Sequence, residues 1–361
     1  MLLLIGGLFA FFLIVGMPVA FALALASIPV FILTGTMPAT VAVQKMVTAT
    51  QSFPLLAVPC FILAGNLMNA TGITNRLVNF ARLLTGWMAG GLGQVSIVLS
   101  MLMGGISGSA VADAAMEARL LGPGMISKGG YSKAAAAAVI AFGSVITATI
   151  PPSIGLILFG FINEVSIGQL FLAGVVPGIL LTAILMLTAW LVAKQNNYAP
   201  DLQSFPTFRE LLASFVDSIW AIAFPVILIV GFRFGFFTAT EAGAFLVFYA
   251  ISDIGMVMLL IMMAAILGYA VTIERGPQQI TELVTALTSE PVLILMLIVT
   301  LLVVSGMFLE GAANILLITP IVLPVLVHAG YDPVHMGILI VTLINLGGLT
   351  PPVGIIMFTV C

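Results

Sequence analysis

Charged residues are scarce in this sequence. Lys, Arg, Asp and Glu make up 6% of the 361 residues, whereas a soluble domain carries about 25%. Hydrophobic residues make up 62%, and apolar runs of about 20 residues, the length that crosses a bilayer as a helix, recur along the chain. The weak alternation typical of a membrane barrel is not the pattern here. We therefore predict an all-α integral membrane protein.

Cysteine and histidine are almost missing. Cys60 and Cys361 lie in apolar contexts, so they predict neither a disulfide framework nor a thiolate metal site. His328 and His335 flank a Gly-Tyr-Asp-Pro turn, where we expect both to be solvated. P-loop, HExxH and GxSxG motifs do not occur, and the net charge of -3 is small. These absences predict no enzyme, no nucleotide, haem or transition-metal cofactor, and no nucleic-acid partner.

Two proline pairs interrupt apolar runs. Pro151-Pro152 lies in GSVITATIPPSIG, and Pro351-Pro352 lies in LGGLTPPVG. Because proline lacks a backbone N–H and clashes with the preceding turn, each run must break at its pair. Within a bilayer a break leaves backbone groups without partners, and it is tolerated only against protein or a hydrated cavity. Two such breaks therefore predict a shared site.

The order of features repeats in two halves, residues 1–195 and 211–361, on either side of a polar connector at 196–210. Each half is expected to hold spanning helices, a surface helix, an interrupted hairpin and a broken span. Met1–Leu33 is expected to cross as one helix, tilted or kinked at Gly16, Pro18 and Pro29. The proline pairs recur at a spacing of 200, and Asp113 matches Asn314 at 201. The predicted elements are hairpin 1 at about 93–127, a broken helix at about 134–161, hairpin 2 at about 291–329 and a broken helix at about 334–361.

Basic residues orient the two hairpins. If the first hairpin opens to the cytoplasm, seven Lys and Arg side chains lie inside and three outside, which fits the positive-inside rule. The second hairpin then opens to the periplasm. This is the arrangement of an inverted repeat, in which two re-entrant hairpins and two broken helices meet near the membrane midplane.

Span lengths predict that segments are absent. Between the spans at 211–234 and 252–272 the chain must return across the membrane through residues 238–250. At about 1.5 Å per residue these reach about 20 Å, short of the roughly 30 Å core. We therefore expect a missing loop near the Ala250/Ile251 junction. The first broken span is followed by another helix, so a C-terminal helix beyond Cys361 is expected as well.

The hairpin tips and the breaks carry the candidate binding residues. Helix N-termini attract anions, while free carbonyls and hydroxyls coordinate a hard cation such as Na⁺. An acidic residue at a helix centre in lipid costs about 2.5 to 3.5 kcal/mol, so Asp113 and Glu310 predict function. A lone Gly or Ser is more often a packing residue. Clusters beside both proline breaks favour binding at 107–113, 306–314 and the two breaks.

Four motifs resemble the large membrane subunit of the tripartite ATP-independent periplasmic (TRAP) transporters, of the ion-transporter superfamily fold. They are GGISGSAVADAAMEARLLGPGM, GSVITATIPPS, TATEAGAF and NLGGLTPPVG, and the resemblance runs from end to end. It implies an inverted-repeat, elevator-type transporter in the bacterial inner membrane. It also implies two partners, a small four-helix membrane subunit and a periplasmic substrate-binding protein. Family members continue beyond the second proline pair and have a loop where Ala250 meets Ile251, in agreement with the span lengths.

The resemblance implies sodium-coupled secondary active uptake of an organic carboxylate, either a sialic acid such as N-acetylneuraminate or a C4-dicarboxylate. The alternatives are a passive channel or pore for small anions, which would need a continuous polar path, and an intramembrane enzyme. On this resemblance the Na⁺ ligands are expected among Ser107, Gly108, Asp113, Gly143, Thr147, Gly306, Glu310, Asn314, Gly347 and Thr350, and the substrate contacts among Ser107, Ser109, Thr149, Pro151, Gly311, Thr350 and Pro351.

Overall fold

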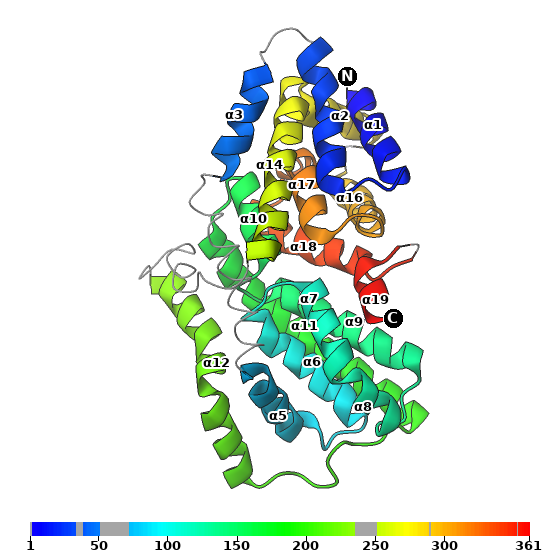
Figure 1. Ribbon diagram of the computed structural model, residues 1–361, viewed down its shortest axis with the longest axis vertical. Helices are drawn as coiled ribbons and strands as arrows, with labels where there is room; N and C mark the ends of the chain where they lie inside the picture. Colours follow the sequence, from blue (N-terminus) through cyan, green and yellow to red (C-terminus); the bar gives the residue numbers. More distant parts are fainter. Residues whose placement is uncertain (1, 34–38, 51–71, 235–250, 289, 352) are drawn as a thin grey trace.

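The computed structural model of the chain describes residues 2–33, 39–50, 72–234, 251–288, 290–351 and 353–361. Within these ranges all regular structure is α-helical (Figure 1), as the composition predicts. The TATEAGAF motif and the return segment at 238–250, which ends at the expected missing loop, lie outside the described residues.

The N-terminal stretch forms two helices where one span is expected. α1 (Leu2–Ile14) and α2 (Val19–Leu33) pack against each other. Between them Gly16 has a positive φ of 84°, and Pro18 lacks a backbone N–H, so the α1 helix cannot continue into α2. The expectation of a single helix over Met1–Leu33 is therefore wrong.

The helices of the first half surround one interrupted hairpin. α5 is amphipathic and packs its apolar face on α6 and on α12, the long helix after the connector. α6 and α7 are joined by a short segment, Gly105–Ser109, which we call tip 1. The bounds are α3 (Ala39–Thr50), α5 (Ile73–Thr85), α6 (Gly91–Gly104), α7 (Ala110–Leu120), α8 (Gly122–Ser127), α9 (Lys133–Thr149), α10 (Ile154–Ile162) and α11 (Ile167–Asn196). α12 (Phe208–Phe234) is the first helix of the second half.

The second half repeats this order. α14 packs against α2 and α3 and is followed by α15, and the segments Met258–Ile273 and Gly276–Ala286 of these two helices meet at a bend of 63°. The hairpin helices α16 and α17 are joined by Met307–Glu310, which we call tip 2. The bounds are α14 (Ile251–Ile273), α15 (Gly276–Leu287), α16 (Pro291–Gly306), α17 (Gly311–His328), α18 (Pro333–Gly347) and α19 (Ile355–Val360).

Each proline pair lies between two helices. α9 ends at Thr149 and α10 begins at Ile154, with a bend of 45° between their axes. Ser153 begins α10, because its hydroxyl accepts a hydrogen bond from the backbone N–H of Leu156 at 3.4 Å. The second pair lies in the longer interval between α18 and α19. The break in each half is thus followed by a short helix.

The two halves exchange these short helices. α10 leaves the first half and packs against α17 and α18, whereas α19 leaves the second half and packs against α7 and α9. Figure 1 follows this exchange: α10 and α18 lie at mid-height, and the red α19 descends beside α9. α9 and α18 also touch directly. Because the contacts are reciprocal, the two breaks and the two tips come together at the centre of the molecule.

Membrane-length helices are few among the described residues. α11 and α17 are each long and apolar enough to cross a membrane, and up to four such spans result if each of two bent pairs counts as one. The bent pairs are α9 with α10 and α14 with α15. The hairpin helix α6, with 14 residues, and its counterpart α16, with 16, are shorter. At about 1.5 Å per residue, neither reaches across a core of about 30 Å.

The polar connector fastens the base of the first hairpin. Asp201 accepts a hydrogen bond from the Arg82 guanidinium at 2.7 Å, and its backbone N–H donates to the carbonyl of Gly86 at 2.8 Å. Tyr198 stacks on Tyr131 with 4.0 Å between ring centroids. These contacts join the end of α5 and the turn before α9 to the connector.

Candidate functional site

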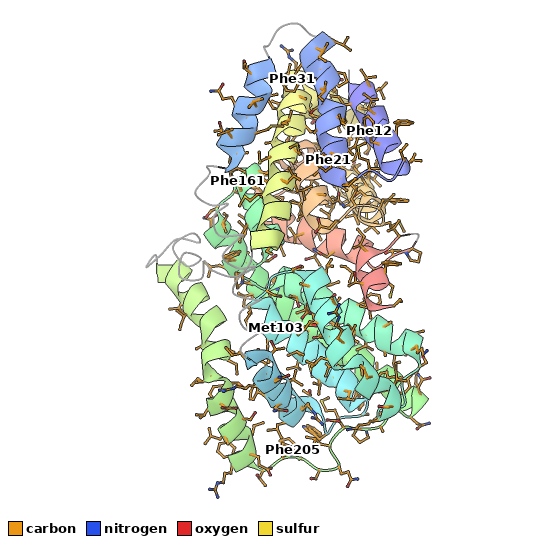
Figure 2. All side chains as sticks on the ribbon, in the orientation of Figure 1. Phe12, Phe21, Phe31, Met103, Phe161 and Phe205 are labelled. Atoms are coloured by element: carbon orange, nitrogen blue, oxygen red, sulfur yellow. The ribbon has the colours of Figure 1, made fainter. Side chains whose placement is uncertain are left out.

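A cavity of about 800 Å³ lies between tip 1 and tip 2. Its walls include the two tips, the first turns of α7 and α17, the starts of α2 and α10, the middle of α14, the end of α18 and the short helix α19. Figure 2 labels two of the lining residues, Phe21 on α2 above and Met103 at the end of α6 below. The volume is that of a small-molecule site, and both halves of the chain contribute to it.

Tip 1 is pressed against the first proline break. Gly108 has a positive φ of 59°, and a Cβ there would lie 2.4 Å from the carbonyl oxygen of Pro152. The carbonyl of Gly108 accepts a hydrogen bond from the N–H of Ile154 at 3.3 Å. Ser109 caps α7 by accepting from the N–H of Ala112. Gly108 is therefore required by both backbone conformation and space, and its predicted neighbours Ser107 and Ser109 line the cavity.

Asp113, in the first turn of α7, combines burial with an unused oxygen. Its side chain is 1% exposed. One carboxylate oxygen, Oδ2, accepts from the Thr147 hydroxyl at 2.7 Å, and that hydroxyl also lies 2.9 Å from the backbone carbonyl oxygen of Ser100. The other oxygen, Oδ1, has no hydrogen-bond partner among the described residues. Carboxylate, hydroxyl and carbonyl oxygens are the ligands of a hard cation, so the predicted pair Asp113 and Thr147 fits Na⁺.

Glu117 is a second buried carboxylate on the same face of α7, and it is missing from the predicted ligands. It is fully buried. Its Oε1 accepts from the Ser100 hydroxyl at 2.9 Å, and its Oε2 accepts from the Ser96 hydroxyl. Residues four apart share a helix face, so the spacing of Asp113 and Glu117 and that of Ser96 and Ser100 could have predicted this cluster.

Gly143 lies behind this cluster. A Cβ at this position would be 3.2 Å from the Ser100 hydroxyl oxygen. Gly143 therefore leaves the space that the Ser100 hydroxyl occupies. It lies near the predicted first cation site, where it lets α9 and α6 approach each other. The described contacts give its carbonyl no role in ligation.

Tip 2 ends in Glu310, which faces the cavity. Its carboxylate caps α17 by accepting from the backbone N–H groups of Ala312 and Ala313 at 3.1 Å and 3.3 Å. A carboxylate at a helix N-terminus is also favoured by the helix dipole. Gly311, the next predicted contact, lines the cavity too. Glu310 therefore has a structural partner in its own helix.

Asn314, one turn further along α17, is fully buried. Neither its Oδ1 nor its Nδ2 has a hydrogen-bond partner among the described residues. A buried amide without partners is costly, and such a group in a native structure calls for a ligand or water. Asn314 therefore fits the predicted second cation site, where its Oδ1 would be the ligand atom.

Gly306 and Gly347 bring two backbones into contact. A Cβ on Gly306 would lie 2.5 Å from the carbonyl oxygen of Ile344, and one on Gly347 would lie 2.5 Å from that of Val303. The N–H of Gly354 donates to the Met307 carbonyl at 3.1 Å, which ties tip 2 to the second break. Both predicted glycines thus belong to the wall behind tip 2.

The described cavity lining includes six of the fifteen predicted residues, Ser107, Gly108, Ser109, Asp113, Glu310 and Gly311. Besides Gly143, Thr147, Gly306, Asn314 and Gly347, four more predicted residues are absent from it, Thr149, Pro151, Thr350 and Pro351. The Thr149 hydroxyl lies 3.2 Å from that of Thr342 and so joins α9 to α18. Pro151 is buried beside Gly174 of α11. Thr350 donates to its own helix, at the Leu346 carbonyl oxygen 3.2 Å away, and Pro351 is exposed. In this conformation these residues shape the breaks behind the cavity without facing it.

The cavity lining is acidic. Asp113 and Glu310 line it, and the described lining residues include no Lys, Arg or His. The ranges outside the description contain none of these residue types either. Among the described residues, no three His, Cys, Asp or Glu side chains lie together as a metal cluster. An anion entering the cavity would meet two carboxylates, so it needs a cation bound with it.

The chain matches the family model described as "Tripartite ATP-independent periplasmic transporter, DctM component" over residues 6–254 and 252–361. It is 36% identical to the 2,3-diketo-L-gulonate TRAP transporter large permease protein YiaN of Escherichia coli (strain K12), over 94% of this chain and 85% of the relative. It is 34% identical to the sialic acid TRAP transporter large permease protein SiaM of Vibrio cholerae serotype O1, over 99% of this chain and 89% of the relative.

A third relative is longer than this chain. The isethionate TRAP transporter permease protein DctMQ of Oleidesulfovibrio alaskensis is 35% identical over 98% of this chain, which covers 59% of the relative. The apolar helices and these permease relatives indicate a multi-pass inner membrane protein. With the family model matched almost from end to end, the chain belongs to the DctM family of TRAP transporter large permeases, and is a transporter subunit rather than an enzyme.

Proposed function

We propose that this subunit takes up an organic carboxylate by sodium-coupled secondary active transport. The observation that carries the proposal is the cavity between tips 1 and 2, into which Asp113 brings a carboxylate with one unpartnered, buried oxygen. Asn314 presents unpartnered atoms at the matching position of the other hairpin. Asp113 lines the cavity, and Asn314 lies one turn beyond the lining residue Glu310. Unpartnered polar atoms at matching positions of two hairpins are what a cation-coupled carrier needs.

The charge of the cavity supports coupling. A carboxylate substrate and the acidic lining repel each other, and the described lining has no basic side chain to balance them. Na⁺ bound at Asp113 cancels one negative charge before the substrate enters. Coupling then follows from electrostatics, because the anion gains affinity when the cation is present.

The proposed movement is that of an elevator. The hairpin helices α6 and α16 are too short to cross the bilayer, which supports re-entrant hairpins opening to the cytoplasm (first) and to the periplasm (second). The exchange of α10 and α19 joins both hairpins into one body. We place α1, α2, α5 and α12 among the scaffold helices. The small four-helix subunit would bind this scaffold, and a periplasmic substrate-binding protein would deliver the substrate.

Charge count favours a monocarboxylate. Each negative charge on the substrate needs its own compensating cation. A sialic acid such as N-acetylneuraminate, with one carboxylate, therefore needs fewer cations than a C4-dicarboxylate, with two. A cavity of about 800 Å³ also has room for a sugar acid. The relatives named for sialic acid and for 2,3-diketo-L-gulonate, both sugar acids, fit this choice.

Reconstitution tests the proposal. The chain, with a small subunit and a binding protein, is placed in proteoliposomes, and uptake of labelled N-acetylneuraminate, 2,3-diketo-L-gulonate and a C4-dicarboxylate is followed with an inward Na⁺ gradient. We expect saturable uptake of at least one of them that stops when choline or K⁺ replaces Na⁺. Unchanged uptake without Na⁺ would refute sodium coupling, and conductance without the binding protein would indicate a pore.

A further inference from the structure

Glu117 is the most deeply buried carboxyl group in the first hairpin, and the proposed transport does not use it. It lies one turn beyond Asp113 on α7 and is fully buried. The two described ion pairs, Arg76 with Asp217 and Arg82 with Asp201, do not include it. A carboxylate buried in a membrane protein without a basic partner is costly and is kept for function more often than for packing.

One of the two hydrogen bonds of Glu117 leads toward Asp113. Both its oxygens accept from serines of α6, so Glu117 fastens α7 to α6 below tip 1. One of these serines, Ser100, turns its backbone carbonyl to the Thr147 hydroxyl, which lies 2.7 Å from Asp113 Oδ2. The chain of contacts therefore runs from Glu117 through Ser100 and Thr147 to the carboxylate with the free oxygen.

The hydrogen bonds also define what kind of role Glu117 has. Each Glu117 oxygen already accepts a hydrogen bond from a serine hydroxyl, and Glu117 is absent from the described cavity lining, so it has no oxygen that is both unpartnered and at the cavity. Asp113 does have one. A cation bound at the cavity would therefore contact Asp113, with Glu117 one helical turn further from the cavity. The contribution of Glu117 is the position of Ser100 and a second negative charge close to the cation.

We propose that Glu117 is a positioning residue for a cation bound at Asp113, which it serves by holding Ser100 beside Thr147 and by adding negative charge to the site. This inference rests on the proposed sodium coupling. It makes the first site the tighter of the two, because tip 2 has Glu310 bonded to its own helix and no equivalent serine network among the described contacts.

Two variants separate charge from position. Glu117→Gln keeps the size of the side chain and can still pair with both hydroxyls, but it removes the charge. The double variant Ser96→Ala with Ser100→Ala keeps the charge and removes the hydrogen bonds. Glu282→Gln is the matched control, because Glu282 is exposed on α15 and far along the chain from this site. All are measured in the complete transporter with its small subunit and binding protein.

The readout is the Na⁺ concentration that gives half-maximal uptake, compared with the maximal rate. A nearby opposite charge changes an ion's affinity as strongly as it changes a proton's, so Glu117→Gln should raise the half-saturating Na⁺ concentration by about tenfold. The serine double variant should raise it by about threefold through lost positioning. Both should approach the wild-type maximal rate at high Na⁺, and Glu282→Gln should match the wild type throughout.

Three results would overturn the inference. One is a wild-type Na⁺ response in Glu117→Gln, and another is a lower maximal rate with the same half-saturating Na⁺, which is the behaviour of a purely structural residue. If Glu117→Gln does not assemble, the serine double variant decides by the same criteria. The third is uptake by the wild-type protein that does not depend on Na⁺. This result overturns the proposed function as well, and the wild-type measurement alone reveals it.

Discussion

The two hairpins place different chemistry at matching positions. Asp113 in the first is a carboxylate with one oxygen bonded to Thr147 and one free, whereas Asn314 in the second is a neutral amide with both atoms free in the described structure. A carboxylate attracts Na⁺ by charge, while an amide oxygen offers a dipole alone. The comparison teaches that the repeat keeps the position of a buried polar side chain but not its charge.

The hairpins also differ in what holds the ligand in place. The first is organised by side chains, since Ser96, Ser100, Thr147 and Glu117 form a connected network. The second is organised by backbone, since Gly306 lies against Gly347. We therefore expect the first hairpin to be sensitive to changes of charge and the second to changes of volume.

Removing the charge of Asp113 should have the largest effect. Asp113→Asn keeps the shape but leaves a neutral ligand at both hairpins. An opposite charge close to a carboxylate is attracted with an energy equivalent to one to three pKa units. Removing the charge of Asp113 should therefore lower the affinity for Na⁺ by about a hundredfold. The measurement is uptake against Na⁺ concentration, with Glu282→Gln as the surface control. A wild-type Na⁺ curve would show that Asp113 is not a ligand and would remove the asymmetry.

Adding one methyl group behind tip 2 should destabilise the protein most. In Gly347→Ala the new Cβ would lie 2.5 Å from the Val303 carbonyl oxygen, so the backbones must separate at a cost of about 3 kcal/mol. Gly143→Ala in the first hairpin meets the movable Ser100 hydroxyl at 3.2 Å and should cost under about 1 kcal/mol.

Thermal unfolding in detergent measures both glycine variants. Gly268→Ala in α14 is the control, because a Cβ there meets nothing within 4 Å. Equal losses in the two hairpins would contradict the view that one is built on side chains and the other on backbone contacts.

Much of the arrangement follows from the sequence because its causes are local. Prolines without an N–H end helices wherever they pair, so α9 and α18 end where the motifs place the breaks. Apolar runs long enough to cross a bilayer likewise predict helices, because a helix satisfies its backbone hydrogen bonds within the run itself. By contrast, Gly16 and Pro18 mark the place of the N-terminal break in the sequence but predict only a kink, because the packing of α1 against α2 depends on contacts that a long apolar run does not show.

The cavity lining was harder to predict than the motif positions. Ser107, Gly108, Asp113 and Glu310 line the cavity, whereas Thr149 and Thr350 bond elsewhere. Which side of a broken helix faces a cavity depends on the rotation of that helix, and packing against the other half of the chain sets it. Lining from α2 and α14 could not be predicted at all, since neither helix carries a polar motif.

Removing the cap of tip 2 should have a moderate effect. Glu310→Ala leaves the N–H groups of Ala312 and Ala313 without their acceptor, which should cost about 1 kcal/mol. Glu310→Gln keeps an acceptor oxygen and should lose less than half of that. Unfolding and Na⁺-dependent uptake are measured together. If both variants lose uptake equally while differing in stability, Glu310 acts through its charge and the second hairpin is not neutral.

Changing Asn314 should have the smallest effect on stability and the most specific effect on Na⁺. Neither amide atom has a described hydrogen-bond partner, so Asn314→Ala breaks no described hydrogen bond. The free energy of unfolding should therefore change by less than about 0.5 kcal/mol. If Asn314 Oδ1 is the weaker of two cation ligands, the half-saturating Na⁺ concentration should rise by about threefold, the value of one hydrogen-bond-sized contact. The cooperativity of the Na⁺ curve should also fall.

Asn314→Asp should shift the half-saturating Na⁺ concentration in the opposite direction by giving the second hairpin the charge of the first. A loss of stability above about 1 kcal/mol with an unchanged Na⁺ curve would instead make Asn314 a packing residue, and would leave the first hairpin as the sole cation site.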